Sequence, residues 1–416
     1  MNLCIESIRQ AFPALQQQVN GEPVYFFDGP GGSQVPQSVL DTMTAYLGKY
    51  NSNLGGRFFS SEKTVDVMRN ARLAGQALLN TESPDNIVFG ANMTSLTFQL
   101  SRAISRDWQA GDEVVVTSLD HYSNVSTWQQ AADDKGAIVH QARVNEDDCT
   151  LDSRHLISLI SAKTKLVALT FASNTTGSLV DVKPIIAAAH AVGAKVYIDA
   201  VHYAPHKLVD VQALGCDFLA CSAYKFFGPH VGIAYVAPQW LHSLSPYKVE
   251  PATNQGPGRF ETGTQSFEAL AGFTAAVEYL AHAGDQTLPL RERLVQSFDL
   301  YQAHEQQLSK HFLAKLTLYS NVTLYGINDM ERLAERTPTF SIRIDHASPE
   351  DVSGLLGQHN MCVWNGHFYA IGLCKQLGIL DKGGVIRIGF MHYNTTSEID
   401  ALFAILETVL ETVVEK

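Results

Sequence analysis

The chain has 416 residues, with 42 acidic and 30 basic side chains and a formal net charge of −12 at pH 7. This acidic balance argues against nucleic acid or an anionic membrane surface as the main partner. Hydrophobic residues make up 45% and charged residues 17%, as in ordinary globular proteins with a large core. No apolar run approaches the length needed to span a bilayer.

The cysteines and the N-terminal residues indicate in which cellular compartment the protein lies. Six cysteines are scattered without the spacing of a disulfide framework, which suggests a reducing environment. The first residues lack the basic and apolar regions of a secretory signal, so we expect a cytoplasmic protein. His359, Cys362, His367 and Cys374 fall close together, but their spacing matches no common zinc pattern, and we expect no metal site.

Short β-branched runs alternate with helical periodicity between residues 86 and 236. This alternation predicts an α/β fold with a mostly parallel sheet that helices cover on both faces. The expected strands are Asn86–Phe89, Glu113–Ser118, Ala137–Arg143, Lys165–Phe171, Lys195–Asp199, Asp217–Ser222 and Val231–Val236. The expected helices between them include Thr94–Ile104, Ser123–Ala132, Ser153–Ala162 and Val182–Ala191.

The pattern changes after residue 265 and predicts a smaller α+β domain over residues 266–416. Its expected elements are two long helices, three strands and a final helix: Phe267–Ala283, Leu288–Phe312, Thr339–Ile344, Met361–Trp364, Val385–Phe390 and Ser397–Val413. We expect a helix shared with the large domain (residues 21–265) at the boundary. Residues 1–20 are expected to form an N-terminal segment that packs on the small domain.

Lys225 and Asp199 are the most informative pair in the chain. Lys225 lies between apolar segments just after one expected strand, and Asp199 ends another. Ligands bind beyond the carboxyl ends of strands in such sheets. A buried lysine is costly unless its charge is removed or used, and a Schiff base with pyridoxal phosphate uses it while a carboxylate holds the pyridine nitrogen. The alternative is a surface lysine and a helix-capping acid, and the pair alone does not decide between them.

Two strand-to-helix turns could serve the same cofactor. The turn at residues 89–95 offers backbone N–H groups and the Thr94 hydroxyl to a phosphate, although many such turns look alike. His121 follows another strand and could stack flat on a pyridine ring. An alternative, compatible with the first, is that Asp120 or Ser123 caps a helix there.

Ordered motifs along nearly the whole chain resemble the class V aminotransferase family of fold-type I pyridoxal phosphate enzymes. Within it they resemble the cysteine desulfurase and selenocysteine lyase group. The motifs occupy residues 25–36, 120–121, 173–177, 199–206, 215–218, 225–229, 260–264 and 387–395. The first contains a Gly-rich stretch, residues 28–33, that we interpret as a turn near the site because it precedes any βαβ unit.

The resemblance implies catalytic and substrate-binding roles for the matching residues. Lys225 would form the Schiff base and later move the substrate's α-proton. Asp199 would pair with the pyridine nitrogen, and His121 would stack on the ring. Asn174 would contact the ring hydroxyl or the substrate carboxylate. Arg387 would clamp the substrate α-carboxylate with a bidentate fork that lysine cannot copy.

The resemblance also implies the remaining cofactor contacts. His202 stands where the family usually has glutamine beside the ring oxygen, which makes its charge state an open issue. Met93, Thr94 and Ser222 belong to the cofactor-binding set, with Thr94 and Ser222 at the phosphate. Thr264 would reach the phosphate in the other subunit, which implies a homodimer.

One position departs from the desulfurase pattern. A desulfurase needs an accessible, activated thiolate, which in the resembling family lies on a loop before the carboxylate-binding arginine. Matching the Gly-His pair and the small residue of 366–370 puts Tyr369 there, whereas counting back from Arg387 lands nearer Cys374. Cys374 falls in an expected amphipathic helix, His367–Leu377, where a buried structural cysteine is the ordinary outcome.

These observations favour a lyase of the cysteine desulfurase or selenocysteine lyase type that cleaves a C–S or C–Se bond of a small α-amino acid. An aminotransferase or epimerase is the alternative, because Tyr369 occupies the cysteine position. A non-catalytic module that binds the cofactor or a sulfur-relay partner is a third hypothesis. The presence of both Lys225 and Arg387 argues against this third hypothesis, because a non-catalytic module does not need an arginine that binds a substrate carboxylate. The sulfur acceptor stays unknown.

Overall fold

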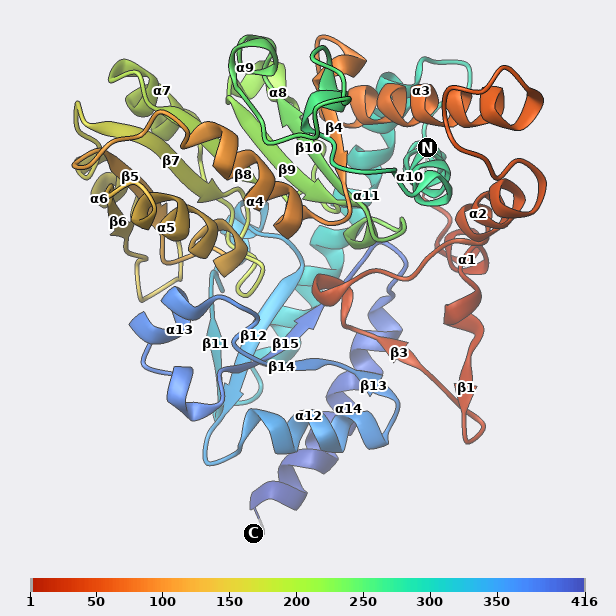
Figure 1. The fold of residues 1–416 in the computed structure, drawn as a ribbon. Helices are drawn as coiled ribbons and strands as arrows, with labels where there is room; N and C mark the ends of the chain where they lie inside the picture. Colours follow the sequence, from red (N-terminus) through yellow and green to blue (C-terminus); the bar gives the residue numbers. More distant parts are fainter. Residues whose placement is uncertain (1–2, 415–416) are drawn as a thin grey trace.

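The computed structural model describes residues 3–414. Its upper part in Figure 1 is built on a seven-stranded sheet with the order β4-β10-β9-β8-β7-β5-β6. The strands are β4 (Ile87–Gly90), β5 (Glu113–Thr117), β6 (Ile138–Ala142), β7 (Thr164–Thr170), β8 (Lys195–Asp199), β9 (Phe218–Ser222) and β10 (Gly232–Val236). Neighbours from β9 to β6 are parallel, and only β10 is antiparallel to its neighbours. The predicted mostly parallel sheet is confirmed.

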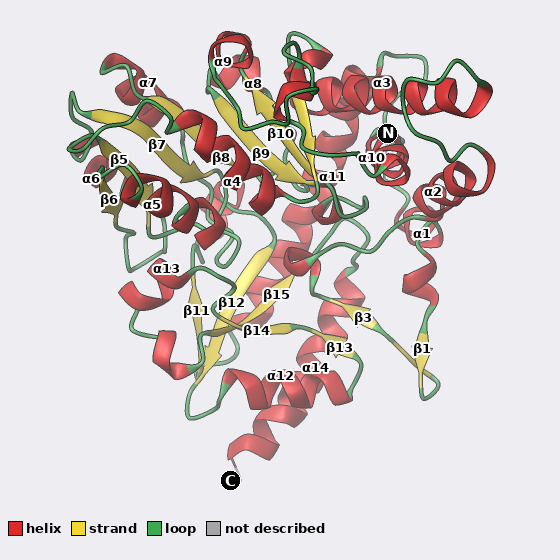
Figure 2. Cartoon of the chain, in the orientation of Figure 1, coloured by secondary structure: helices red, strands yellow, loops and turns green. Residues whose placement is uncertain are grey.

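Helices cover both faces of this sheet (Figure 2). Successive residues of a strand point to opposite faces, so neighbours such as Val196 and Tyr197 enter different hydrophobic cores. One core is completed by α3 (Phe59–Leu79), α7 (Lys183–Ala191) and α10 (Phe267–Leu280), and the other by α4 (Met93–Ile104) and α5 (Ser126–Asp133). Strands buried on both faces explain the continuous apolar runs in the sequence.

A second, four-stranded antiparallel sheet lies below in Figure 1, with the order β11-β12-β15-β14. Its strands are β11 (Val322–Tyr325), β12 (Thr339–Ile344), β14 (Trp364–Gly366) and β15 (Val385–Gly389), and α12 (Pro349–Gln358) and α14 (Thr396–Val414) pack on it. Helix α11 (Leu290–Leu316) joins both parts, because Leu294 and Phe298 enter the core of the large sheet and Leu308 and Phe312 enter that of the small one. The domain limits at residues 20 and 265 stay predictions.

The N-terminal segment contacts both parts of the fold. Helix α1 (Ile5–Gln10) carries Arg9, whose Nη1 lies 2.8 Å from Glu398 Oε1 and donates to the Tyr393 carbonyl at 2.8 Å. Phe12 is fully buried and meets the rings of Phe227 and Tyr393 edge to face. Helix α2 (Gln37–Lys49) follows and packs on α10.

Several expected elements differ in extent from those in the structure, and three of them show a physical reason. The strand expected at Met361–Trp364 divides into β13 (Met361–Cys362), which pairs with β3 (Tyr25–Phe26), and β14 in the small sheet. Helix α6 (Ser153–Ser158) ends early, since the Ser161 and Thr164 side chains bond to nearby backbone N–H groups. Helix α13 (Ile371–Gln376) starts late, because the two residues before Ala370 have positive φ. Within residues 3–414, no helix is long and apolar enough to cross a membrane.

Candidate functional site

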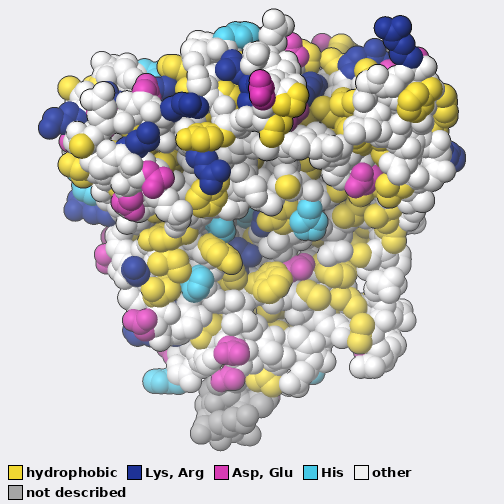
Figure 3. All heavy atoms as spheres, viewed as in Figure 1, with side chains coloured by type: hydrophobic (Ala, Val, Ile, Leu, Met, Phe, Trp, Pro, Cys, Tyr) yellow, Lys and Arg dark blue, Asp and Glu magenta, His cyan; other side chains and the backbone are white. Residues whose placement is uncertain are grey.

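A cavity of about 310 Å³ lies at the carboxyl ends of β7, β8 and β9. The predicted site residues that line it are Met93, Thr94, His121, Asn174, Asp199, His202, Ser222 and Lys225. Arg387, Thr264 and Cys374 are not among its lining residues. In Figure 3, hydrophobic side chains gather along the boundary between the upper and lower parts, near the level of this cavity.

Lys225 ends a short 3-10 helix, Ala223–Lys225, directly after β9. Its ammonium group donates to the carbonyl oxygen of Pro30, in the Gly-rich turn that the sequence placed near the site. Burial and the nearby charge of Arg387 together lower the pKa of Lys225 to about 7, against the opposing effects of the Asp199 and Asp28 carboxylates. A large fraction of the amine is therefore neutral and nucleophilic near pH 7.

Asp199 is the last residue of β8 and is 4% exposed. Its Oδ1 accepts a hydrogen bond from the Val201 backbone N–H at 2.9 Å. Burial raises the pKa of Asp199 to about 6, against the opposing effects of this hydrogen bond and of Lys225. Asp199 is therefore ionised at pH 7 inside a low-dielectric site, where a cationic ring nitrogen would be its natural partner.

His121 sits at the start of a 3-10 helix, Tyr122–Asn124, and caps it by accepting the Ser123 backbone N–H on Nδ1 at 3.1 Å. The expectation that Asp120 or Ser123 is the cap was wrong, because the Asp120 carboxylate instead accepts from the Asn124 amide at 2.7 Å. Burial lowers the pKa of His121 to about 4, so the imidazole is neutral at pH 7. A neutral, oriented ring suits stacking on another aromatic ring.

Arg387 lies on β15 and is 5% exposed. Its Nη1 donates to the Asn174 carbonyl at 2.9 Å, and its guanidinium carbon stands 3.9 Å from the centre of the Phe368 ring. Nε has no partner among the described residues. Burial lowers the pKa of Arg387 to about 9, so the group stays cationic at pH 7 with one edge free for a carboxylate.

The loop before α13 closes over this region. Phe368 and Tyr369 have φ of +50° and +59°, which is uncommon for residues other than glycine. The Phe368 carbonyl accepts from the Asn174 amide at 2.9 Å, and the Tyr369 carbonyl accepts from the Tyr122 backbone N–H at 2.8 Å. These bonds tie the small-sheet loop to the large part of the fold.

Tyr369 and Cys374 have different surroundings. The Tyr369 ring is 65% exposed and stacks on His121, with centroids 5.0 Å apart and planes at 28°. Cys374 lies on α13, is fully buried and packs with Ile379 and Val385. Burial raises the pKa of the Cys374 thiol to about 11, which disfavours the thiolate that a nucleophile needs.

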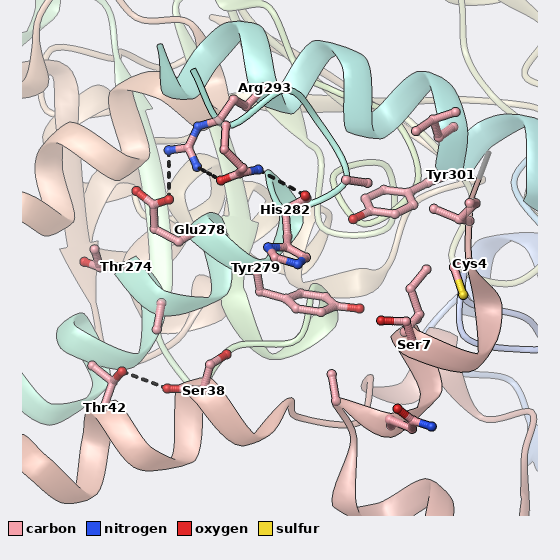
Figure 4. A pocket seen from close by; sticks show the side chains of 18 of the residues that line it. Cys4, Ser7, Ser38, Thr42, Thr274, Glu278, Tyr279, His282, Arg293 and Tyr301 are labelled. Atoms are coloured by element: carbon pink, nitrogen blue, oxygen red, sulfur yellow. Dashed lines mark hydrogen bonds and ion pairs between the residues drawn. The ribbon is translucent and has the colours of Figure 1, made fainter. Parts of the chain in front are cut away.

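Two other hollows differ in their relation to the cavity. Thr264 lines an adjacent one of about 590 Å³ together with Ser95 and His230, and His230 also lines the cavity. The largest, about 1010 Å³, lies between α1, α2, α10 and α11 and holds none of the predicted site residues (Figure 4). In it Arg293 binds Glu278 and Gln286, each at 2.9 Å.

The lining residues fit pyridoxal phosphate. The N-terminus of α4 and the Thr94 and Ser222 hydroxyls, which bind no described residue, can hold a phosphate. Asp199 and His121 can hold the ring, and Asn174 keeps a buried Oδ1 without a partner that can take a donor. The residues that the structure describes contain no group of three or more His, Cys, Asp or Glu side chains placed to hold a metal ion.

Sequence reasoning missed two contributors to the site. Asp28 has a buried Oδ1 without a described partner, and burial raises its pKa to about 6 against the effects of Arg387 and Lys225. Its place before the Gly-rich turn was a signal that could have identified it. The Pro30 carbonyl that receives Lys225 could not be found this way, because a backbone acceptor leaves no mark in side-chain identity.

Comparisons with known proteins agree with this geometry. Residues 25–402 match the family model of class-V aminotransferases. A probable cysteine desulfurase of Halalkalibacterium halodurans is 30% identical, with 97% of each chain covered. The aminotransferase-like protein FGM3 of Gibberella zeae is 32% identical, with 98% of each covered. An apo cysteine desulfurase from Thermococcus onnurineus superposes with a TM-score of 0.88 at 24% identity, covering 99% of this chain and 100% of that one.

The parallel sheet, the lysine after β9 and the acid at the end of β8 define a fold-type I enzyme that depends on pyridoxal phosphate. The chain belongs to the class-V aminotransferase family. The predicted fold, family and cofactor are thereby confirmed.

The lowered pKa of Lys225 generates a prediction about its reactivity. In protein stripped of cofactor with hydroxylamine, pyridoxal plus borohydride should label Lys225 with a half-maximal rate near pH 7. Ordinary lysines titrate at about 10.4 and should label slowly there. Peptide mass spectrometry across pH measures both, with Lys225→Arg as the control. A Lys225 labelling rate that climbs only above pH 9 would contradict the electrostatic argument.

Proposed function

We propose that the protein is a lyase that cleaves the C–S or C–Se bond of a small α-amino acid, as the cysteine desulfurase and selenocysteine lyase group does. The observation that carries the proposal is that Lys225 and Asp199 line one cavity while Arg387 is bonded to Asn174 at its edge. Pyridoxal phosphate, when bound, supplies an electron sink for negative charge at the substrate α-carbon. The relatives named cysteine desulfurase support this activity.

Each side chain has a task in this proposal. Lys225 would hold the cofactor aldehyde, and its amine, which the Pro30 carbonyl positions, would accept the proton from the substrate α-carbon. Asp199 keeps a proton on the ring nitrogen, and His121 stacks on the ring. Arg387 binds the α-carboxylate through its free edge, which fixes the α-carbon over the site.

The cofactor phosphate and ring oxygen have their own partners in this proposal. Thr94 and Ser222 bind the phosphate beside Met93 at the N-terminus of α4. His202 would serve the ring oxygen, and the free Oδ1 of Asn174 would accept from the ring hydroxyl or from a donor on the substrate. Cys374 takes no part, because burial keeps its thiol protonated.

Tyr369 determines which group can accept the substrate sulfur. A phenol cannot accept sulfur as a persulfide, so an external thiol must do so when cysteine is the substrate. The balanced reaction is cysteine plus RSH giving alanine plus RSSH. Cysteine sulfinate needs no such acceptor, because its sulfur leaves as an oxidised sulfur species.

This reasoning predicts the products and their thiol dependence. The pure protein should form alanine without added thiol from cysteine sulfinate, whose sulfur leaves as SO2, and from selenocysteine, whose selenium leaves as the element. It should form alanine from cysteine only with an added thiol. Chromatography of alanine and pyruvate, with assays of released sulfur and selenium, tests this. Failure of all three substrates to lose sulfur or selenium would reject the proposal.

A second candidate is an aminotransferase or epimerase, and Tyr369 in place of a thiol is the observation that favours it. Transamination would convert the cofactor to its pyridoxamine form in the presence of an amino acid. Epimerisation would place solvent deuterium at the α-carbon. If no amino acid in a full panel gives the pyridoxamine form or deuterium at the α-carbon, this candidate is rejected.

The Arg387 clamp predicts a specific kinetic change. Arg387→Lys should raise KM about 10–100-fold, because a bidentate charge-assisted pair becomes a single contact worth about 1.5–3 kcal/mol less. The cofactor absorbance should be unchanged, since Arg387 does not line the cavity. Arg69→Lys on the exposed surface is the matched control. An unaltered KM would mean that Arg387 does not bind the substrate α-carboxylate.

We also propose a homodimer in which Thr264 reaches the partner's cofactor. Thr264 lies outside its own cavity, and apolar side chains are exposed along α2, α3 and the loop between them. They are Leu40, Leu47, Leu54, Phe58, Phe59 and Val65. Sedimentation should give twice the chain mass, and Thr264→Val should weaken cofactor retention several-fold. A monomer that retains cofactor normally would contradict both parts.

We propose a cytoplasmic location, supported by the six cysteines that are all free in the part of the chain that the structure describes. Labelling of thiols in intact cells with a membrane-permeant reagent, against an impermeant one, tests it. The expected absence of nucleic-acid and membrane partners stays a prediction from the net charge and the lack of apolar runs.

A further inference from the structure

Three buried titratable side chains lie in a row behind the cofactor cavity. His202 lines the cavity, and its ring meets that of His206 edge to face with centroids 5.5 Å apart. His206 Nδ1 lies 3.0 Å from Glu305 Oε2, on α11. The three residues are 3%, 2% and 3% exposed. The row therefore connects the cavity to the helix that joins the two sheets.

His202 is held by the small sheet. Its Nε2 lies 3.0 Å from the Thr339 hydroxyl and 3.2 Å from the Thr337 hydroxyl, at the start of β12. Its Nδ1 has no partner among the described residues. The two threonines thus fix the orientation of the ring and leave one ring nitrogen for whatever occupies the cavity.

The charges around His202 are mostly positive. Burial lowers the pKa of His202 well below the ordinary value for histidine, and His206, Lys225 and Arg387 lower it further. His202 is therefore neutral at pH 7. Glu305 supplies a negative charge at the far end of the row, close enough to raise the pKa of Lys207, which burial lowers.

Other charged groups also face the pair of His206 and Glu305. Arg336 shares a shallow hollow with Glu305, but its guanidinium donates to backbone carbonyls such as that of Thr176. His392 lies near His206, and burial keeps its pKa low. Neither group forms an ion pair with Glu305 among the described residues.

The pair is incompletely satisfied. His206 Nε2 and Glu305 Oε1 are both buried without a partner in the described part of the chain. A buried ionisable pair with open hydrogen-bonding positions costs folding free energy, and apolar residues of similar size would fill the space more favourably. Its position directly behind His202 points to a role at the site.

We propose that His206 and Glu305 are positioning residues that act on the bound cofactor through His202. The Glu305 carboxylate orients His206, and His206 packs against the ring of His202 that Thr337 and Thr339 hold. The pair turns its positively charged end, His206, toward His202, and this charge lowers the proton affinity of the cofactor beside His202. The inference rests on the proposed place of His202 beside the cofactor.

The test is a pH titration of the visible absorbance of the cofactor-loaded protein. Glu305→Gln should raise the midpoint, with an ionisation constant changed about three- to tenfold, because His206 loses the carboxylate that stabilises its positive charge. Glu305→Asp should restore it. Glu278→Gln is the matched control: it changes the net charge equally, but in the separate hollow of Figure 4, and should leave the midpoint unchanged.

The route through His202 is tested by a double-mutant cycle. In a His202→Gln background, Glu305→Gln should cause no further shift. An unchanged or lowered midpoint in Glu305→Gln, or an equal shift in the His202→Gln background, would overturn the inference. If Glu305→Gln fails to fold by circular dichroism, His206→Gln takes its place with the same expected direction. Absence of visible absorbance in the unaltered protein would instead refute cofactor binding itself.

Discussion

The removal of the Lys225 amine from water is the constraint on which the rest of the site depends. An ammonium group in this position is destabilised by burial and by Arg387, and only the Pro30 carbonyl and the carboxylates of Asp199 and Asp28 oppose that effect. The balance leaves an amine that is easily deprotonated. Burial raises the proton affinity of Asp199 at the same time. Burial in the same cavity therefore makes the Lys225 amine a nucleophile and leaves Asp199 as an acid whose negative charge a cationic partner would stabilise.

The loop that ends at Tyr369 is a defined structure beside the cavity. Its left-handed residues are held by bonds to Asn174 and Tyr122, and the Tyr369 ring stacks on His121. Phe368 covers one face of Arg387. In the proposed function, this loop shields the group that binds the substrate carboxylate and carries a phenol at the position proposed for the desulfurase cysteine.

Much of this site was accessible from sequence, and the reasons differ between residues. Asp199 and Lys225 follow from strand ends in a parallel sheet, because that topology puts all carboxyl ends at one edge. Ser222, Arg387 and Thr264 came only from family resemblance. Asp28, the Pro30 carbonyl and the pair of His206 and Glu305 were not predicted, since they depend on contacts between segments far apart in sequence. The late start of α13 was missed because nothing in Phe368 or Tyr369 signals positive φ.

The site residues are divided between the two sheets, and this affects how the protein would lose function when it is damaged. Lys225 and Asp199 belong to the large sheet, whereas Arg387 and the two threonines that hold His202 belong to the small one. In the proposed function, fraying of the small sheet would remove substrate recognition while Lys225 still holds the cofactor. A heated or aged preparation would then keep its yellow colour after it has stopped working, so pigment alone is a poor measure of how much competent enzyme a sample holds.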